Sequence, residues 1–327
     1  MSIAEKMASN QKQIAISEFF EKNKHFLGFD TLNRAIITAV KEAVDNSLDA
    51  CEEARILPDI SIEIQRVPNK KDNLILIAKD NGPGIPQKSI ENVFGKLLYG
   101  SRFHAIRQSR GQQGIGITGV VMYSQLTTGK QTYVKSKIAS ENTAIEVNLG
   151  IDTRKNKAVK YRQERVIWTE DDEIIKHGLM IKTEMKAKFQ RGNQSIGQYL
   201  KMTSIVNPHA NIRFKYINSE GETEIDEFWK RATRNLPKPV NSIKPHPHGI
   251  HLGQLQRMLK ESEERKLTSF LRQNFSGVSS RAAKEVCTKA GLSDGAKPKL
   301  LKAEQINSLL DACTNVKFLP PPTNCLS

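Results

Sequence analysis

The chain has 327 residues, of which 38% are hydrophobic, and its 50 Lys and Arg against 35 Asp and Glu give a formal net charge of +15. This composition supplies ordinary hydrophobic cores and excludes a chain that is disordered throughout. The longest apolar run covers only residues 74–78, which excludes a membrane-spanning helix of about 20 residues.

The N-terminus and the cysteines indicate a reducing, cytoplasmic location. The first residues, MSIAEKMASNQKQ, contain no apolar segment of the kind that a secretory signal needs. The cysteines lie far apart without a CxxC pair, which argues against a disulfide scaffold and a cysteine zinc site. They are Cys51, Cys287, Cys313 and Cys325.

The first two thirds of the chain predict an α+β domain over residues 17–234, after a polar N-terminal arm of residues 1–16. Apolar residues at helical spacing predict helices at 31–56, 89–99, 114–126 and 194–206. Alternating or continuous apolar runs predict strands at 60–67, 73–79, 131–138, 143–149, 158–168, 179–187 and 211–217. Because helices are mixed with mostly meandering strands, α+β is favoured over repeated βαβ units.

The rest of the chain predicts a basic, all-helical module over residues 252–315. Four prolines in residues 235–251 predict a stiff linker before it, and residues 316–327 are expected to start a link to a further domain. Residues 228–327 hold 17 Lys and Arg against 7 Asp and Glu, a net charge of +10. This charge favours contact with a polyanion, and a solubilising surface is the alternative.

Two polar residues share a face of the first long helix. Glu42 and Asn46 are four residues apart, so their side chains project to the same side. A carboxylate can act as a general base toward water, and an amide oxygen is a suitable ligand for Mg²⁺. The pair alone also fits a solvated helix face.

A second motif, Asp80-Asn-Gly-Pro-Gly84, directly follows an apolar strand. An acidic residue at a strand end can enter a cleft, and Gly82 and Gly84 allow the backbone to approach a flat ligand closely. An ordinary Asx turn is the alternative interpretation.

A third motif opens the helix at 114–126, after a polar, basic loop at 100–113. Glycines at a helix start leave N–H groups available for phosphate oxygens. The pattern is neither a dinucleotide-binding fingerprint nor a P-loop, because the glycine order and the preceding segment differ. Its residues are Gly111, Gln112, Gln113, Gly114, Ile115 and Gly116.

In this order, the three motifs resemble the nucleotide-binding motifs of the GHKL ATPases, the superfamily of gyrase, Hsp90 chaperones, MutL and histidine kinases. The segments EFFEKNKHFLGFD, FGKLLYGSRFHAIRQSRGQQGIG and NLPKPVNSIKPHPHGI look like the B subunits of archaeal type II DNA topoisomerase VI. The likeness runs from about residue 17 to residue 327. It implies a GHKL (Bergerat-type) sandwich of a mixed sheet and helices, followed by a helix-two-turns-helix module.

The resemblance also implies cofactors and roles. The cofactors are ATP and Mg²⁺: Glu42 would polarise the water that attacks the γ-phosphate, Asn46 would hold Mg²⁺, and Asp80 would accept a hydrogen bond from the adenine amino group. Gly82 and Gly84 would lie beside the base. The amides of residues 111–116 would bind the β- and γ-phosphates. Catalysis of this kind depends on positioning and charge neutralisation.

The implied partners are the A subunit of topoisomerase VI, in an A2B2 heterotetramer, double-stranded DNA and, on ATP binding, a second copy of the chain. ATP-driven dimerisation would gate the passage of one DNA duplex through another and relax supercoils, in the cytoplasm and on the nucleoid. A different class, a non-catalytic nucleotide-gated DNA clamp, is the alternative, and another GHKL chaperone or repair ATPase is a third possibility.

The sequence departs from the resembled family in two places. Leu179 stands where the family has a threonine beside the adenine, and Thr183 lies about 13 Å further along the strand at about 3.3 Å per residue. The family also continues into a transducer domain with a lysine for the γ-phosphate, and this chain ends at Ser327. We therefore expect the chain alone to bind ATP but to hydrolyse it poorly.

Three histidines lie close together in the linker at positions 246, 248 and 251. With prolines between them and no cysteine or carboxylate nearby, a packed linker is favoured over a zinc site. His104 and Arg107 in the polar loop are interpreted as solvated, with phosphate contact as the alternative.

Overall fold

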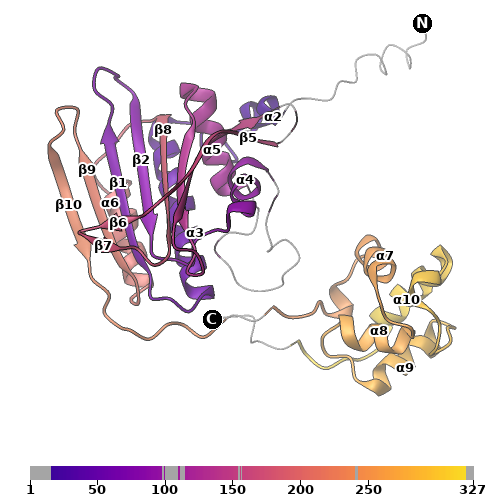
Figure 1. Ribbon diagram of the computed structural model, residues 1–327. Helices are drawn as coiled ribbons and strands as arrows, with labels where there is room; N and C mark the ends of the chain where they lie inside the picture. The colour runs from indigo at the N-terminus through magenta and orange to yellow at the C-terminus, as the bar shows by residue number, and fades with distance from the viewer. Residues whose placement is uncertain are drawn as a thin grey trace, which may run out of the picture. The chain divides into compact units, whose positions relative to one another are not determined.

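The computed structural model describes residues 16–97, 99, 110, 115–153, 155, 157–239 and 242–321. Within this part, the chain forms two compact units, one that ends at Pro237 and one that begins at Lys238. Figure 1 shows the first as a layered α/β unit and the second as a group of helices. Residues 1–15 of the predicted arm and the last residues of the chain, 322–327, lie outside the described residues, and Ile16, the last residue of that arm, begins α2.

The first unit is built on an eight-stranded mixed sheet in the order β10-β9-β1-β2-β8-β3-β4-β5 (Figure 1). Its strands are β1 (Asp59–Arg66), β2 (Asn73–Asp80), β3 (Thr132–Lys137), β4 (Ala144–Asp152), β5 (Lys157–Val166), β8 (Gly178–Lys186), β9 (Asn211–Ile217) and β10 (Thr223–Trp229). Only the β1–β9 pair is parallel among these described strands. The expected α+β class with a mixed sheet is confirmed.

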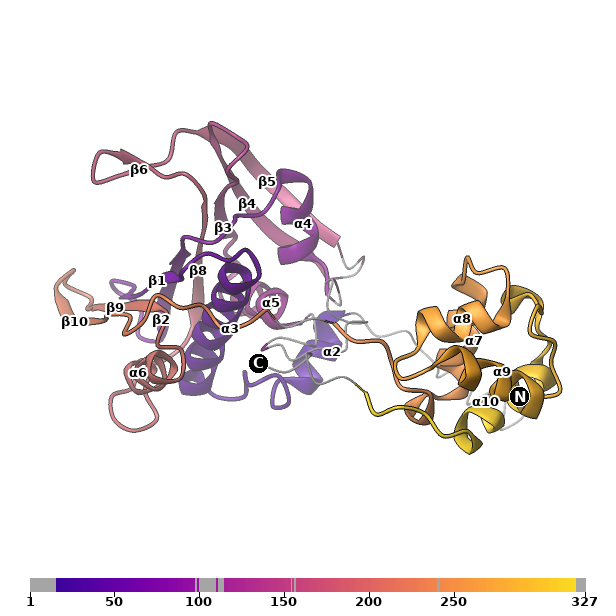
Figure 2. The same cartoon turned by 90° about the horizontal axis from the view of Figure 1, so that it is seen from below.

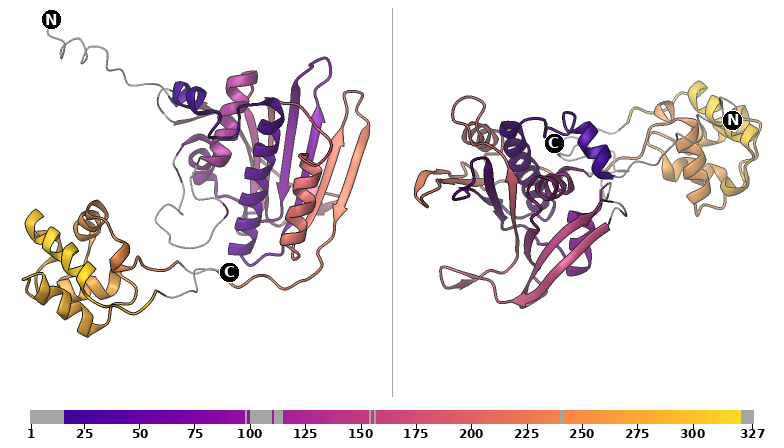
Figure 3. Two further views of the ribbon diagram at one scale, coloured as in Figure 1. Left: turned by 180° about the vertical axis from the view of Figure 1, so that it is seen from behind. Right: turned by 90° about the horizontal axis from the view of Figure 1, so that it is seen from above.

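Helices cover the sheet. Figure 3 shows α3, α5 and α6 against one face of the sheet, and Figure 2 shows α4 beside β4 and β5. The helices of this unit are α2 (Ile16–Asn23), α3 (Leu32–Glu53), α4 (Gln87–Gly95), α5 (Gly116–Thr128) and α6 (Ile196–Val206). Inward-facing aliphatic side chains such as Val40, Leu48, Ile62 and Leu76 are fully buried between these layers. The core therefore holds α3 at a fixed position over β1 and β2.

Sequence reasoning missed three features in this unit. The helix α2 lies in a segment for which no element was predicted, and β6 (Thr169–Glu170) pairs with β7 (Glu173–Ile174) in a short hairpin. The edge strand β10 was also missed, because three of the seven residues in its sequence TEIDEFW are acidic, most are exposed, and they show no apolar alternation. Its partner β9 provides the pairing that forms it.

The second unit is all-helical, as expected. Its helices are η1 (Pro247–Gly249), α7 (Leu252–Glu261), α8 (Leu267–Asn274), α9 (Ser280–Lys289), η2 (Pro298–Leu300) and α10 (Ala303–Asn315). They enclose a separate core that includes the fully buried Leu255, Phe270 and Leu309.

The histidines of the Pro-rich segment pack within this second unit. The rings of His246 and His248 bond the carbonyl oxygens of Leu319 and Val316 at 3.1 Å and 2.9 Å. The expected packed linker is confirmed for these two residues. The described residues contain no group of three or more metal-ligating side chains, and none of their helices has the length and apolarity that a membrane span requires.

Candidate active site

A cavity of about 1040 Å³ in the first unit brings together residues from all three sequence motifs. Glu42 and Asn46 of α3, Asp80 of β2 and Gly84 line it, with Ile115 and Gly116 at the start of α5. Gly111, Gln112, Gln113 and Gly114 lie outside the described residues, as do His104 and Arg107. The convergence of the described residues is a finding, and their roles stay predictions.

The helix α3 delivers Glu42 and Asn46 to the cavity. It begins after Thr31, whose side-chain oxygen accepts a hydrogen bond from the Arg34 amide at 3.3 Å, as an N-cap does. One face of the helix is buried against the sheet through residues such as Val40 and Val44. Because Glu42 and Asn46 are one turn apart, the packing of that face places both at the cavity.

The Glu42 carboxylate lies against the first residue of α5. A Cβ added to Gly116 would overlap the Glu42 Oε2 atom, so the absence of a side chain at 116 allows this approach. Burial, and to a lesser degree the charge of Asp45, raise the pKa of Glu42, while Lys41 opposes the shift. A carboxylate with a raised pKa is suited to accept a proton near neutral pH.

Asp80 is held at the end of β2 by hydrogen bonds to both of its carboxylate oxygens. Its Oδ2 accepts from the Ser47 hydroxyl at 2.7 Å, and its Oδ1 accepts from the Gly82 amide at 2.9 Å. Burial raises the pKa of this carboxyl group, against hydrogen bonds from Ser47, Gly82 and Leu179 that lower it. The side chain is thus oriented before any ligand arrives.

The two glycines of the second motif lie close to other parts of the protein, and of the two only Gly84 lines the cavity. Gly82 donates to Asp80, and its carbonyl oxygen lies 2.9 Å from the Nδ1 atom of His177. Gly84 has a φ of 73°, and a Cβ there would overlap the carbonyl oxygen of Lys137. Only glycine fits this position without a shift of the neighbouring backbone.

We expect Gly84→Ala to lower the free energy of unfolding by about 3 kcal/mol, because strain in the left-handed region adds to the overlap with Lys137. Gly129→Ala is the matched control, since Gly129 has a φ of 68° but no atom within 4 Å of an added Cβ. Its expected cost is about 1 kcal/mol. Urea unfolding measures both, and equal losses would contradict the proposed overlap.

The start of α5 lies at the wall of the cavity. Its N-cap residue, Ile115, makes no side-chain capping bond, so the first-turn amides have no such partner. Ile115 and Gly116 both line the cavity. This arrangement suits an anion such as a phosphate group.

Leu179 stands where the resembled family has a threonine, and the structure shows a different hydroxyl group next to Asp80 that sequence reasoning did not identify. Leu179 lines the cavity, and the Thr183 hydroxyl is bonded to that of Thr132 at 3.0 Å in the buried sheet. The hydroxyl that meets Asp80 belongs instead to Ser47 on α3. Ser47 directly follows Asn46 in the sequence, and this position was the available signal that Ser47 belongs to the site. The two residues of the contact, Ser47 and Asp80, are 33 positions apart.

Sequence reasoning missed four charged residues of the cavity wall, which are Arg34, Lys41, Asp45 and Arg110. Tyr199 donates to the Asp45 carboxylate at 3.4 Å. Burial raises the pKa of Asp45, and the charges of Lys41 and Arg110 oppose this shift. Asp45 lies three positions after Glu42, so helical spacing could have identified it; no local pattern marks Arg110.

Comparison with known proteins finds one matching family and several relatives. Residues 31–153 match the family described as histidine kinase-, DNA gyrase B-, and HSP90-like ATPase. The whole chain is 49% identical to the B subunit of type 2 DNA topoisomerase 6 from Methanosarcina barkeri, covering 51% of it. A protein of the same name from Archaeoglobus fulgidus is 48% identical over 98% of this chain, which covers 51% of that relative. The chain therefore spans about half the length of these relatives.

A solved structure, the ATPase region of Saccharomyces cerevisiae topoisomerase II, is also similar. It has a TM-score of 0.43 and 10% sequence identity to this chain, with 67% of this chain and 62% of that chain covered.

Proposed function

Over its whole length the chain is a homologue of the B subunit of type 2 DNA topoisomerase 6, and on this basis we propose that it binds and hydrolyses ATP for an archaeal type IIB topoisomerase. In this proposal it acts with the A subunit, and ATP binding joins two copies of the chain and gates DNA passage. Relaxation of supercoils belongs to the complete complex, and the chain supplies its nucleotide-binding part.

The observation that carries the proposal is the convergence of Glu42, Asn46, Asp80 and the start of α5 on one cavity. These groups come from segments up to 74 positions apart, counting from residue 42 to residue 116. They provide a base, a hard oxygen ligand, a buried acceptor and backbone donors. A nucleoside triphosphate needs this combination, since it carries a flat base at one end and charged phosphates at the other.

Each group has a separate task in this proposal. Asp80, fixed by Ser47 and Gly82, accepts a hydrogen bond from the exocyclic amine of adenine. The amides that begin α5 bind the phosphate oxygens. Glu42 takes a proton from the water that attacks the γ-phosphate, and its raised pKa suits that role.

The oxygen-bearing side chains near Glu42 also fit a magnesium ion. Asn46 and Asp45 line the same cavity, and their side chains carry hard oxygen ligands of the kind that Mg²⁺ prefers. Asn46 would hold the ion while substrate phosphates and water complete its coordination. When bound, the ion neutralises phosphate charge.

The proposal is tested by titration calorimetry of the chain with a non-hydrolysable ATP analogue, with and without Mg²⁺. Size-exclusion chromatography with light scattering follows the mass in the same samples. We expect saturable binding that Mg²⁺ strengthens and a doubling of the mass with the analogue. No heat of binding at millimolar analogue would overturn the proposal.

We expect Asn46→Ala to remove most of the Mg²⁺-dependent gain in analogue affinity, about tenfold, because the amide oxygen is lost. The control is Asn33→Ala, on the same helix, where Asn33 bonds Gln190 outside this cavity. Calorimetry with Mg²⁺ or EDTA measures the gain for each variant. An undiminished gain in Asn46→Ala would show that another residue holds the ion.

The charge of the last 100 residues of the chain supports contact with DNA. Residues 228–327 carry a net charge of +10, from 17 basic and 7 acidic residues. Phosphate contacts by such a surface would give salt-dependent binding without sequence preference. A DNA-directed role would also place the protein on the nucleoid in the cytoplasm. The non-catalytic clamp would share this DNA contact but would not turn over ATP, so turnover in the complete complex distinguishes the two.

A further inference from the structure

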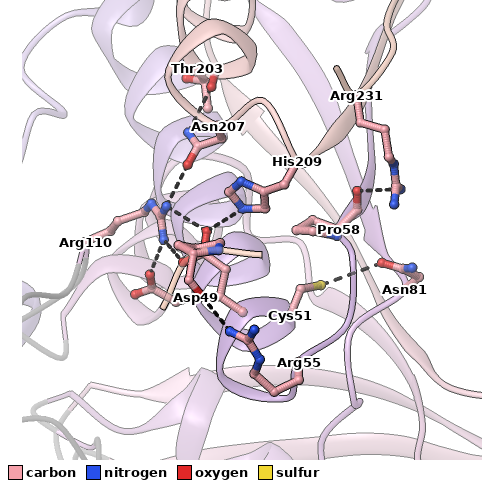
Figure 4. A network of polar contacts seen from close by, with 12 residues as sticks. Asp49, Cys51, Arg55, Pro58, Asn81, Arg110, Thr203, Asn207, His209 and Arg231 are labelled. Atoms are coloured by element: carbon pink, nitrogen blue, oxygen red, sulfur yellow. Dashed lines mark hydrogen bonds and ion pairs between the residues drawn. The ribbon is translucent and has the colours of Figure 1, made fainter. Parts of the chain in front are cut away.

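Arg110 makes a dense set of polar contacts at the edge of the cavity (Figure 4). Its Nη1 atom donates to Asp49 Oδ1 at 2.8 Å and to Glu52 Oε2 at 2.9 Å. Its Nη2 atom donates to Glu52 Oε1 at 2.8 Å and to Asn207 Oδ1 at 2.7 Å. One guanidinium thus ties α3 to the end of α6.

The partners of Arg110 are themselves fixed. Asn207 is 6% exposed, and its amide donates to the Thr203 carbonyl oxygen at 2.8 Å. The His209 ring, 5% exposed, lies 2.9 Å from Glu52 Oε1 (Figure 4). A guanidinium that bonds carboxylates in such a partly buried setting forms strong, geometrically specific contacts.

The position of Arg110 in the sequence connects this network to the candidate site. Arg110 directly precedes residues 111–116, which the sequence predicts to bind phosphate, and α5 begins at Gly116. Asp49 and Glu52 lie on α3, three and six positions after Asn46. The same helix therefore carries the predicted base, the predicted magnesium ligand and the anchors for Arg110.

We propose that Arg110 is a positioning residue: its bonds to Asp49, Glu52 and Asn207 fix the C-terminal half of α3, which carries Asn46, relative to the end of α6 beside the cavity. This inference rests on the proposed function. The alternative is that Arg110 contacts a phosphate directly. Both of its terminal nitrogens are bonded to side chains, and releasing them would leave the partly buried carboxylates of Asp49 and Glu52 without this partner.

The positioning role and the direct phosphate contact predict different effects of a substitution at Glu52, a partner of Arg110, on the affinity for an ATP analogue. Glu52→Gln weakens the anchor but leaves Arg110 in place. A positioning role predicts that Glu52→Gln and Arg110→Ala both weaken binding of a non-hydrolysable ATP analogue, about tenfold or more for Arg110→Ala. A direct phosphate contact predicts that Glu52→Gln leaves the affinity unchanged or increases it, because the arginine is released.

The experiment is calorimetry of the full chain with the Mg²⁺-bound analogue and, separately, with adenosine. We expect both variants to lose affinity for the analogue but to keep the wild-type affinity for adenosine, and Arg110→Lys to recover part of the loss. Arg213→Ala is the matched control, because Arg213 also forms a paired contact, with Asp226 at 2.8 Å and 2.9 Å, but on β9 and β10 away from the cavity. Thermal unfolding without ligand checks that each variant folds, and Arg110→Lys replaces Arg110→Ala if that variant does not.

The outcomes separate the inference from the proposed function. Wild-type affinity in Glu52→Gln, or an equal loss for adenosine and the analogue, overturns the positioning role alone. Absence of analogue binding by the wild-type chain overturns the proposed function and this inference with it.

Discussion

Glu42→Gln is expected to lower ATP turnover by about 10²–10⁴-fold in the complex reconstituted with the A subunit, while the affinity for a non-hydrolysable analogue stays at the wild-type value. The amide keeps the shape that packs against Gly116 but cannot take the proton of the attacking water. Single-turnover hydrolysis and calorimetry measure the two quantities separately. Wild-type turnover would show that another group acts as the base.

The control for this substitution is Glu53→Gln, at the exposed end of the same helix. We expect it to leave turnover unchanged.

The role of Glu42 also sets the direction of the pH dependence. Burial first, and then Asp45, raise the pKa of Glu42 above the ordinary carboxyl range, and only the deprotonated form can act as a base. Wild-type turnover should therefore fall as the pH is lowered through this raised pKa. The residual turnover of Glu42→Gln should not show this fall, because the variant lacks the titrating carboxyl group.

Asp80→Asn is expected to weaken binding of ATP, ADP and AMP alike by about 10- to 100-fold, because all three share the base that this carboxylate recognises. Both carboxylate oxygens already accept a hydrogen bond, from Ser47 and from the Gly82 amide. An asparagine would turn an NH₂ group toward one of these donors and would lose the charge-assisted bond to adenine. Calorimetry with each nucleotide measures the loss.

The control for Asp80 is Asp226→Asn, an exposed carboxylate paired with Arg213 on the sheet edge. It should leave all three affinities unchanged. A loss in Asp80→Asn restricted to ATP would instead place the carboxylate near the phosphates. The pattern also differs from that expected for Arg110, whose substitution should spare binding of adenosine.

Elements with strong local periodicity were predicted well. The helix expected at 31–56 is α3, and the alternating strand expected at 60–67 is β1. Both have a buried face that repeats every 3.6 or 2 residues, so the pattern alone indicates the element. The three motifs could be located for the same reason, since each lies at the end of such an element or on its face.

The edge strand β10 shows where this reasoning fails. Its residues are mostly exposed, so no apolar period marks it, and it exists because β9 offers a free edge after a turn. The same limit applies to the contact of Ser47 with Asp80: its place next to Asn46 draws attention to Ser47, but nothing nearby in the sequence shows that its hydroxyl donates a hydrogen bond to Asp80. Pairings of this kind depend on where distant elements pack.

By itself, the sequence determined the element types, the division of charge between the two parts of the chain, and the residues of the three motifs, because these depend on neighbours a few positions apart. Only the tertiary structure decided that Glu42 and Gly116 touch, that Ser47 orients Asp80, and that Arg110 joins α3 to Asn207, 97 positions away. Packing of the two layers sets these contacts, since burial of α3 against the sheet fixes the direction in which each of its polar side chains points.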